Sequence, residues 1–418
     1  MSLTSFRFLH AADIHLDSPL HGLSRYEGLP VEEIRSATRT AFDNLVQCAI
    51  DERIDFLMVA GDLFDGDWRD MGTGLYFAKA MGRLDQAGIP AFLLAGNHDA
   101  SSVISRTVPW PPNVRLFGSR RPETHRLPEF SVAVHGQSFS TPSVTENLVL
   151  GYPTAEPHVF NIGMLHTALA GRQGHANYAP CSVEDLKSRR YDYWALGHVH
   201  EFEVVSEAPY VVFPGNLQGR TIRETGAKGA VLVSVSDGEV TSVERLELDV
   251  IRWARLDVDC TGAPMDDVPD LLRSALAELD GANASGRPLI ARVTLVGETT
   301  DAGALYDNAA TLRDDVRAIA SSISSDLYVE KVRVEVIESV RTAFVVGDDL
   351  GAMIDEAPTD LVLIDALGRD LERFLLTAGT SLGDADDGYL RLAAARGDWS
   401  GLLRKASTAL RSRLMAEG

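Results

Sequence analysis

The sequence predicts an α/β fold, because short apolar segments alternate with helical segments along its first half. The apolar segments lack strict alternation and are typical of strands buried on both faces: residues 6–11, 56–60, 91–95, 159–164 and 193–196. Helical segments at residues 31–53 and 74–87 separate the first three. In such a core, ligand sites collect at the carboxyl ends of the strands.

The pattern changes after residue 200, where short β-rich segments are separated by Gly and Asp-Gly turn signals. They are residues 203–205, 210–213, 230–235 and 240–248. We expect them to form a second sheet that completes a β-sandwich. The first domain is therefore expected to cover residues 1–250.

Two further regions follow this domain. Residues 251–340 have the order strand, helix, strand, helix, strand, which predicts a separate small α/β domain: 253–258, 268–279, 289–296, 305–323 and 327–336. Residues 341–418 are predicted to be helical, with two amphipathic apolar stripes. These stripes suit either a helical hairpin packed on the body or a docking element for a partner, and both interpretations stay open.

Composition sets limits on function. The chain has 418 residues, 45% of them hydrophobic, and its three cysteines lie far apart, so neither a disulfide framework nor a thiolate zinc site is indicated. We find neither a signal peptide pattern nor an apolar run long enough to span a membrane, and we expect a cytoplasmic protein. The net charge of −21 opposes a polyanionic substrate, although bound divalent metals would neutralise part of the acidic cluster in the site.

Five short motifs follow the predicted strands and contain most of the candidate functional residues. In chain order these residues are Asp13, His15, Asp62, Asn97, His98, Asp99, His166, His198 and His200. Two divalent metals about 4 Å apart need oxygen and imidazole ligands and a bridging carboxylate. The motifs supply that set, with Asp62 as the natural bridge. Such metals lower the pKa of water towards neutrality for attack on phosphorus, so the sequence predicts a two-metal phosphoesterase site.

Other candidate residues surround this set. His98 could protonate the leaving oxygen or stabilise charge on the phosphoryl group, Asp99 could orient it, and Asp65 is expected to support a ligand. His21 and His175 lie in loops near the motifs and are candidate substrate contacts. No Gly-x-Ser-x-Gly elbow is present, so covalent catalysis has no candidate nucleophile.

The motif series resembles that of the calcineurin-like metallophosphoesterases over about the first 250 residues. Within this superfamily, segments 8–19 (FLHAADIHLDSP) and 174–180 (GHANYAP) resemble bacterial DNA repair exonucleases of the SbcD and YhaO type. These are relatives of the nuclease subunit of double-strand-break repair complexes. The resemblance implies a β-sandwich flanked by helices in four α/β/β/α layers, a small α/β capping domain and a helical segment that binds an SMC-like coiled-coil ATPase.

The resemblance also implies roles for individual residues. One metal would be held by Asp13, His15, Asp62 and His200, and the other by Asp62, Asn97, His166 and His198, with His98 as the catalytic histidine. The family favours manganese, and the ligands also permit iron or zinc. DNA is the implied substrate, and a homodimer through the phosphoesterase domains is the implied assembly.

The sequence thus predicts a metal-dependent phosphodiesterase that cleaves DNA in repair, as an exonuclease or an endonuclease. Two alternatives stay open. One is a small-molecule or cyclic-nucleotide phosphodiesterase, against which the long extension after residue 250 counts. The other is a non-catalytic scaffold whose metal site only binds phosphates.

Overall fold

The computed structural model describes residues 5–18, 29–65, 71–101, 110–169, 178–283, 285–339, 348–378 and 396–416. The chain divides into two compact units: unit 1 contains the described residues of 1–21 and 30–253, and unit 2 those of 22–29 and 254–418. Both predicted substrate-contact histidines, His21 and His175, lie outside the described residues.

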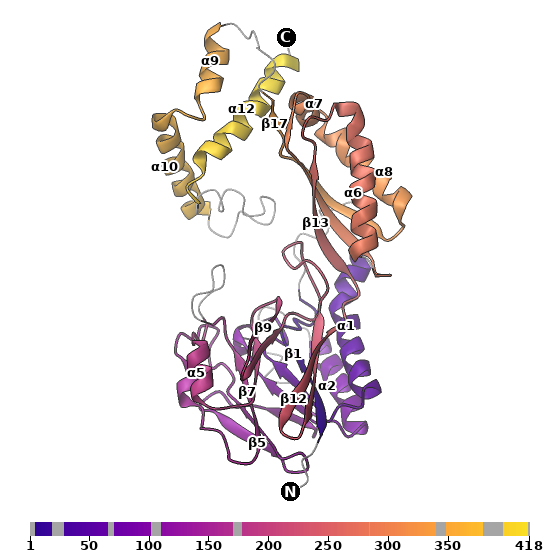
Figure 1. The fold of residues 1–418 in the computed structure, drawn as a ribbon, viewed down its shortest axis with the longest axis vertical. Coiled ribbons are helices and arrows are strands. Elements are labelled where there is room, and N and C mark those ends of the chain that lie inside the picture. Colours follow the sequence, from indigo (N-terminus) through magenta and orange to yellow (C-terminus); the bar gives the residue numbers. More distant parts are fainter. Residues whose placement is uncertain are drawn as a thin grey trace. The chain divides into compact units, whose positions relative to one another are not determined.

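Two six-stranded sheets form the body of unit 1 (Figure 1). The first sheet has the order β12-β11-β1-β2-β3-β4, in which β1 is Phe6–Ala11, β2 Phe56–Ala60, β3 Ala91–Leu94, β4 Val114–Leu116, β11 Gly229–Ser236 and β12 Glu239–Glu247. The second has the order β5-β6-β7-β8-β10-β9, in which β5 is Glu123–Leu127, β6 Val132–Gly136, β7 Phe160–His166, β8 Tyr193–Gly197, β9 Phe202–Glu207 and β10 Tyr210–Pro214.

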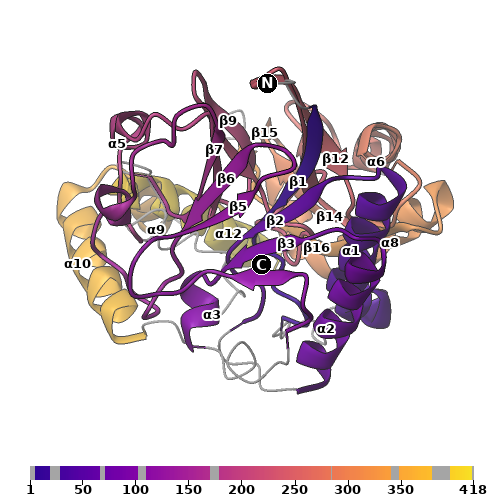
Figure 2. The same ribbon diagram turned by 90° about the horizontal axis from the view of Figure 1, so that it is seen from below.

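Helices cover the outer face of each sheet, as Figure 2 shows for α1 and α2 beside β1 to β3. Within the described residues, the helices of unit 1 are α1 Val31–Asp51, α2 Met71–Gln86, α3 Asn97–Ser101, the short 3-10 helix η2 Leu148–Gly151 and α5 Val183–Ser188. Helix α1 begins after Pro30, whose missing N–H is no loss at a helix start, and buries Phe42, Leu45 and Val46 on one face.

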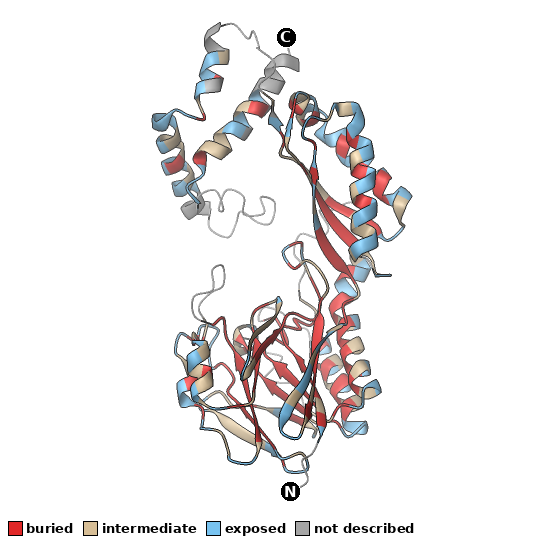
Figure 3. Ribbon diagram, viewed as in Figure 1, coloured by how far each residue is buried: buried red, intermediate tan, exposed pale blue. Residues whose placement is uncertain are grey.

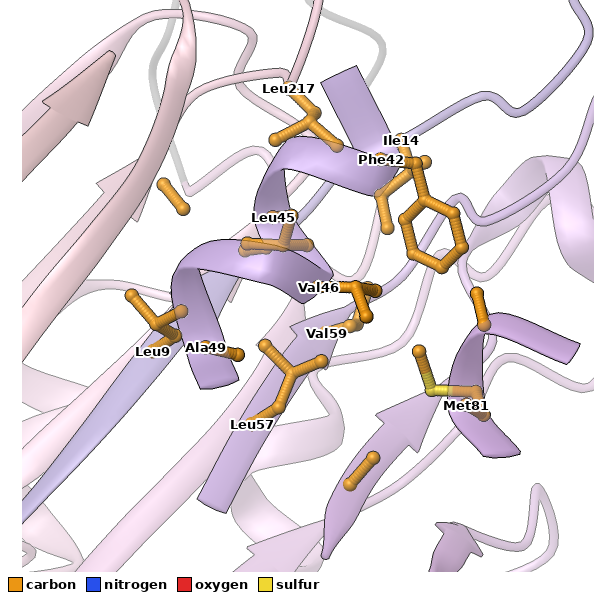
Figure 4. Close-up of a cluster of buried hydrophobic side chains, with 14 of the residues drawn as sticks. Leu9, Ile14, Phe42, Leu45, Val46, Ala49, Leu57, Val59, Met81 and Leu217 are labelled. Atoms are coloured by element: carbon orange, nitrogen blue, oxygen red, sulfur yellow. The ribbon is translucent and has the colours of Figure 1, made fainter. Parts of the chain in front are cut away.

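Successive residues of the same strands point to opposite faces of the first sheet and so contribute to two separate cores. In β1, Phe8 faces the second sheet, whereas Leu9 packs under α1. In β2, Met58 likewise faces the second sheet and Leu57 packs under α1. Figure 4 shows Leu9, Leu57 and Val59 beneath the apolar side chains of α1. The predicted sandwich flanked by helices, with four α/β/β/α layers, is confirmed.

The composition of the second sheet differs from our expectation. Strands β9 and β10 join it, but β11 and β12 extend the first sheet, where β11 pairs antiparallel with β1. The centre of the second sheet is instead β7 and β8, which we had grouped with the first core. The physical reason is that Val231, Val233 and Val235 of β11 continue the apolar layer between the sheets. Strands β4, β5 and β6 were not predicted.

Unit 2 contains a three-stranded sheet in the order β13-β14-β16, of strands β13 Arg252–Asp259, β14 Leu289–Val296 and β16 Leu327–Val334. Its further elements are η3 Met265–Asp267, α6 Val268–Asn283, β15 Glu298–Thr299, α7 Ala302–Asp307, α8 Ala309–Ile323 and β17 Ile337–Glu338. The helix predicted over residues 305–323 is interrupted at Asn308, which separates α7 from α8. Figure 3 shows that the central strands of unit 2, like those of unit 1, are largely buried.

Among the described residues that follow in unit 2 are the helices α9 Asp348–Glu356, α10 Leu361–Ala378 and α12 Trp399–Ala416. Helix α12 packs against α7, β17, α9 and α10, and Trp399 lies against Gly368 of α10. The predicted helical segment is therefore attached to the small domain through α12. Within the part of the chain that the structure describes, none of the helices is both long and apolar enough to cross a membrane.

Candidate metal centre

The candidate ligands lie where strands of both sheets end. Asp13 and His15 follow β1, Asp62 follows β2, and Asn97 begins α3 directly after β3. From the second sheet, His166 is the last residue of β7, and His198 and His200 follow β8. Because β1, β2 and β3 are parallel neighbours and β7 and β8 are also parallel, their carboxyl ends meet at one edge of the sandwich.

The backbone at this edge adopts a conformation that side chains disfavour. Asp13, His15, Asp62 and His198 have φ angles of 51°, 46°, 52° and 99°. Such left-handed residues persist only where their surroundings enforce the conformation. Here the loops hold each other, since the backbone N–H groups of Asp13 and His15 donate to the carbonyl oxygens of Gly61 and Asp62, each over 3.0 Å.

Donor atoms converge in overlapping clusters. Asp13, His15 and His200 form one, Asp62, His166 and His198 form another, and His15, Asp62 and His98 form a third that shares residues with both, with the ligand atoms of each within 4.8 Å of one another. Asp62 Oδ2 lies 3.4 Å from His166 Nε2 and 3.9 Å from His15 Nε2, so this carboxylate faces the first two clusters. His200 Nε2 lies 3.6 Å from Asp13 Oδ1, and Asn97 Oδ1 lies 3.0 Å from His166 Nε2.

The donor set fits divalent metals. Nδ1 of His15, His166 and His200 lies against Asp65 Oδ1 (2.7 Å), the carbonyl oxygen of Ala60 (3.0 Å) and Glu224 Oε1 (2.7 Å), respectively. Since these oxygens accept hydrogen bonds, we assign the ring proton to Nδ1, which leaves Nε2 facing other acceptors. Among the described residues, Asp13 Oδ1 and His15 Nε2 are buried without a hydrogen-bond partner. Convergent, unsatisfied acceptors of this kind are what a metal ion satisfies.

The charges within the cluster shift the pKa values of its histidines and aspartates. Burial opposes the charge of His166, but Asp62 outweighs it and raises the pKa of His166 to about 9. At His200, burial also opposes the charge, but the carboxylates of Asp13 and Glu224 outweigh it and raise the pKa of His200 to about 9. Burial also disfavours the charge of Asp62, yet the neighbouring imidazoles, His166 first, hold its pKa below the usual range. A metal bound by these imidazoles would displace protons from them, so metal affinity is expected to fall at low pH.

His98 and Asp99 differ in their surroundings. His98 Nδ1 lies 3.1 Å from Asp65 Oδ1, and this hydrogen bond raises the pKa of His98. The Asp99 carboxylate accepts the backbone N–H groups of Leu63, Phe64 and Gly96 over 2.9 to 3.1 Å, and burial followed by the charge of Asp62 raises its pKa to about 7. The Asp65 carboxylate therefore contacts the His98 ring, and orientation of His98 by Asp99 stays a prediction. Asp99 joins the loops that carry Asp62 and Asn97.

Three further residues lie at the site, and of these Glu224 was not predicted, whereas Arg220 and Lys228 belong to a group of basic residues that the sequence offered either as solvated loop charges or as a track for a phosphate backbone. Arg220, Glu224 and Lys228 lie in the loop between β10 and β11 and contact His200 or its partners. Glu224 could have been sought from one general rule: a histidine that binds a metal through one ring nitrogen donates the N–H of the other to an acceptor. His200 had no such acceptor in the predicted set, and Glu224 is an acidic residue in the loop after the next hairpin.

Comparison with known proteins gives a consistent family. Residues 6–202 match the family model of calcineurin-like phosphoesterases, and residues 253–337 match that of the middle domain of metallophosphoesterase YhaO. The uncharacterized metallophosphoesterase YhaO of Bacillus subtilis (strain 168) is 35% identical over 300 residues, which cover 71% of this chain and 72% of that protein.

More distant relatives are DNA double-strand break repair proteins Mre11. The Sulfurisphaera tokodaii protein is 24% identical over 263 residues, covering 59% of this chain and 64% of that protein. The Aeropyrum pernix protein is 26% identical over 273 residues, covering 60% and 63%. The matched region thus spans just under two thirds of these two proteins.

Proposed function

The chain belongs to the calcineurin-like metallophosphoesterase family, and we propose that it is a two-metal phosphodiesterase that cleaves DNA. Metal-dependent hydrolysis of a phosphoester is the activity that the family supports. The observation that carries the proposal is the convergence of imidazole Nε2 atoms and carboxylate oxygens on both sides of Asp62. The same constellation is not needed for binding phosphate alone, for which backbone amides and cations suffice.

We assign Asp13, His15, Asp62 and His200 to one metal, and Asp62, Asn97, His166 and His198 to the other. The clusters Asp13, His15, His200 and Asp62, His166, His198 support this division, and the third cluster places Asp62 close to His15 as well. Manganese is the proposed ion, and this mixture of oxygen and imidazole ligands also suits iron or zinc. When bound, the ions supply Lewis-acid polarisation of the phosphoryl group and lower the pKa of the attacking water.

His98 is the proposed general acid. Its hydrogen bond to Asp65 fixes the ring and raises its pKa, so the imidazole retains a proton to donate to the leaving oxygen. About half of its side chain is exposed, which is compatible with contact to a substrate. Asp99 acts indirectly in this proposal, by holding the loops of Asp62 and Asn97 together through three backbone N–H groups.

DNA as the substrate is supported by the relatives named Mre11 and by the length of the chain. Unit 2 is far more than a small phosphoester requires, and we propose that its α/β part, residues 251–340, is a capping domain that selects the substrate. His21 and His175 remain predicted substrate contacts. The proposed setting is DNA repair, with exonuclease and endonuclease action as the two forms to be distinguished.

The test is a manganese-dependent assay on end-labelled DNA with free and with blocked ends. We expect cleavage by the wild-type protein, and the comparison of ends separates exonuclease from endonuclease. His98→Ala is expected to bind manganese normally and to lose about two to four orders of magnitude in rate, typical of one acid-base group. Equal rates in the two proteins would remove His98 from the mechanism.

Two outcomes would overturn the DNA proposal. If neither single-stranded nor double-stranded DNA is cleaved while a cyclic nucleotide is hydrolysed readily, the protein is a small-molecule phosphodiesterase. If manganese binds but no phosphodiester is hydrolysed, the site is a phosphate-binding scaffold.

We also propose that the helical segment binds an SMC-like ATPase, and the homodimer remains a prediction from the family. Leu361 and Val362 at the start of α10 are 80% and 79% exposed, and Phe374 further along is 49% exposed. Deletion of residues 347–418 is expected to abolish ATPase binding and spare hydrolysis of a chromogenic diester. Since α12 packs on α7 and β17, Val362→Asp is the milder test. Unchanged ATPase binding in Val362→Asp and Phe374→Asp would exclude the exposed α10 surface.

A further inference from the structure

The loop between β10 and β11 places three charged side chains beneath the metal centre. The exposed fractions of the Arg220, Glu224 and Lys228 side chains are 15%, 11% and 1%. Charges this far from water are costly unless they are paired and hydrogen-bonded. Glu224 and Lys228 contact His200, and Arg220 contacts Glu224 and Asp65, which hydrogen-bond to His200 and His15.

Glu224 and Lys228 together hold His200. Glu224 Oε1 accepts the Nδ1–H of His200 over 2.7 Å, which prevents rotation of the ring and keeps Nε2 towards Asp13 Oδ1. Lys228 Nζ donates to the carbonyl oxygen of His200 over 2.8 Å and pairs with Glu201 over 3.0 Å. Both the ring and the backbone of this ligand are therefore fixed from the same loop.

Arg220 connects this arrangement to the opposite side of the cluster. Its backbone N–H and its Nη2 donate to Glu224 over 2.7 and 2.9 Å, and its Nη1 lies 3.6 Å from Asp65 Oδ2. Asp65 in turn holds Nδ1 of His15 and of His98. One planar guanidinium thus lies between the two carboxylates, an arrangement that the single ammonium of lysine cannot reproduce.

The second cluster is supported from elsewhere. Nδ1 of His166 donates to the carbonyl oxygen of Ala60 in β2, so its orientation does not depend on the loop. We infer that Arg220 and Glu224 are positioning residues that set the occupancy of the metal position formed by Asp13, His15 and His200, and leave the other position unaffected. This inference rests on the proposed two-metal function of the site.

The test is a manganese titration of the metal-stripped full-length protein, followed by calorimetry and by electron paramagnetic resonance. Wild type should bind two equivalents with a spin-coupled signal. Glu224→Gln and Arg220→Lys should bind one equivalent as wild type does and the second about 10- to 100-fold more weakly, the usual effect of losing a ligand's supporting partner. Arg223→Met, at an exposed position in the same loop, also removes a positive charge and should behave as wild type.

Hydrolysis of a chromogenic diester gives a second readout. In Glu224→Gln and Arg220→Lys, the manganese concentration for half activation should rise by the same factor, and the rate should recover at saturating manganese. In His98→Ala the rate should stay low at every manganese concentration. The dependence of the rate on manganese concentration therefore distinguishes a residue that positions a metal ligand from one that transfers a proton.

Two results would overturn the inference. The first is that either variant binds both equivalents of manganese with wild-type affinity. The second is that the affinity for both equivalents falls and the thermal unfolding temperature falls with it, which would mean that the loop supports the fold in general and not one metal position. Failure of the proposed function is distinct, because a wild-type protein that binds two manganese ions and hydrolyses no diester would still show the selective loss in Glu224→Gln.

Discussion

His10 should make the stability of unit 1 depend on pH in a way that one substitution removes. The side chain is fully buried in β1, with Nδ1 3.1 Å from the Tyr193 hydroxyl and Nε2 3.1 Å from the carbonyl oxygen of Leu196. Since the carbonyl only accepts, Nε2 carries the proton and Nδ1 accepts from Tyr193. Burial lowers the pKa of His10 from 6.5 to about 3.

The sign follows from proton binding. Between pH 6.5 and about 3 the unfolded chain binds a proton at His10 and the folded protein does not, so acid favours unfolding. His10 therefore removes stability as the pH falls below 6.5, by about 1.4 kcal/mol for each pH unit well below that value. His10→Gln retains an N–H donor and a carbonyl acceptor but does not titrate.

The assay is urea denaturation of the metal-stripped wild type and of His10→Gln at pH 7.5 and 5.5. The difference in unfolding free energy between the wild type and His10→Gln should change by about 1.4 kcal/mol between pH 7.5 and pH 5.5, with the wild type losing stability relative to the variant. The comparison cancels other titrating groups, including the buried ligands. A difference that does not change between the two pH values would refute the assignment of a neutral, buried His10.

Three further changes have definite expectations. Gly96→Ala places a Cβ 2.3 Å from Asp62 Oδ1 and 2.9 Å from its backbone nitrogen, so manganese titration should show both equivalents weakened; Gly82→Ala, which meets no atom within 4 Å, should bind both normally. Removing manganese with a chelator should lower the thermal unfolding temperature of unit 1, because an ion at about 100 times its Kd stabilises by about 2.7 kcal/mol; identical melting curves would argue against metal binding. Glu330→Ala leaves the buried Arg292 guanidinium without the carboxylate that it contacts over 2.9 Å. Urea denaturation should therefore show that the unfolding free energy of unit 2 falls by about 3 to 5 kcal/mol. A fall below about 1 kcal/mol would indicate that water can replace the Glu330 carboxylate.

The structure brings together the metal-ligand candidates that local sequence could identify, because each motif directly follows an apolar strand. Asp13 and Asp62 were recognisable for that reason, and the strands themselves were predicted within a few residues. Which sheet each strand joins was not predictable in the same way. The pairing of β11 with β1 joins segments more than 200 residues apart, and no local pattern specifies it. Glu224 was missed for a similar reason, since its relation to His200 exists only once β10 and β11 are in place.

The glycines of the motifs are explained by the contact between the two sheets. A Cβ at Gly197 would lie 1.9 Å from the carbonyl oxygen of Ala60, and one at Gly61 would lie 2.4 Å from His166 Nδ1. The hydrogen bond from His166 to Ala60 joins β7 of the second sheet to β2 of the first across this gap. Only a residue without a side chain lets the strand ends approach closely enough for that bond. The proposed metal ligands come from both sheets, so the geometry of the candidate site depends on this approach, and we expect Gly61 and Gly197 to be as necessary to the site as Asp62 and His198, which follow them.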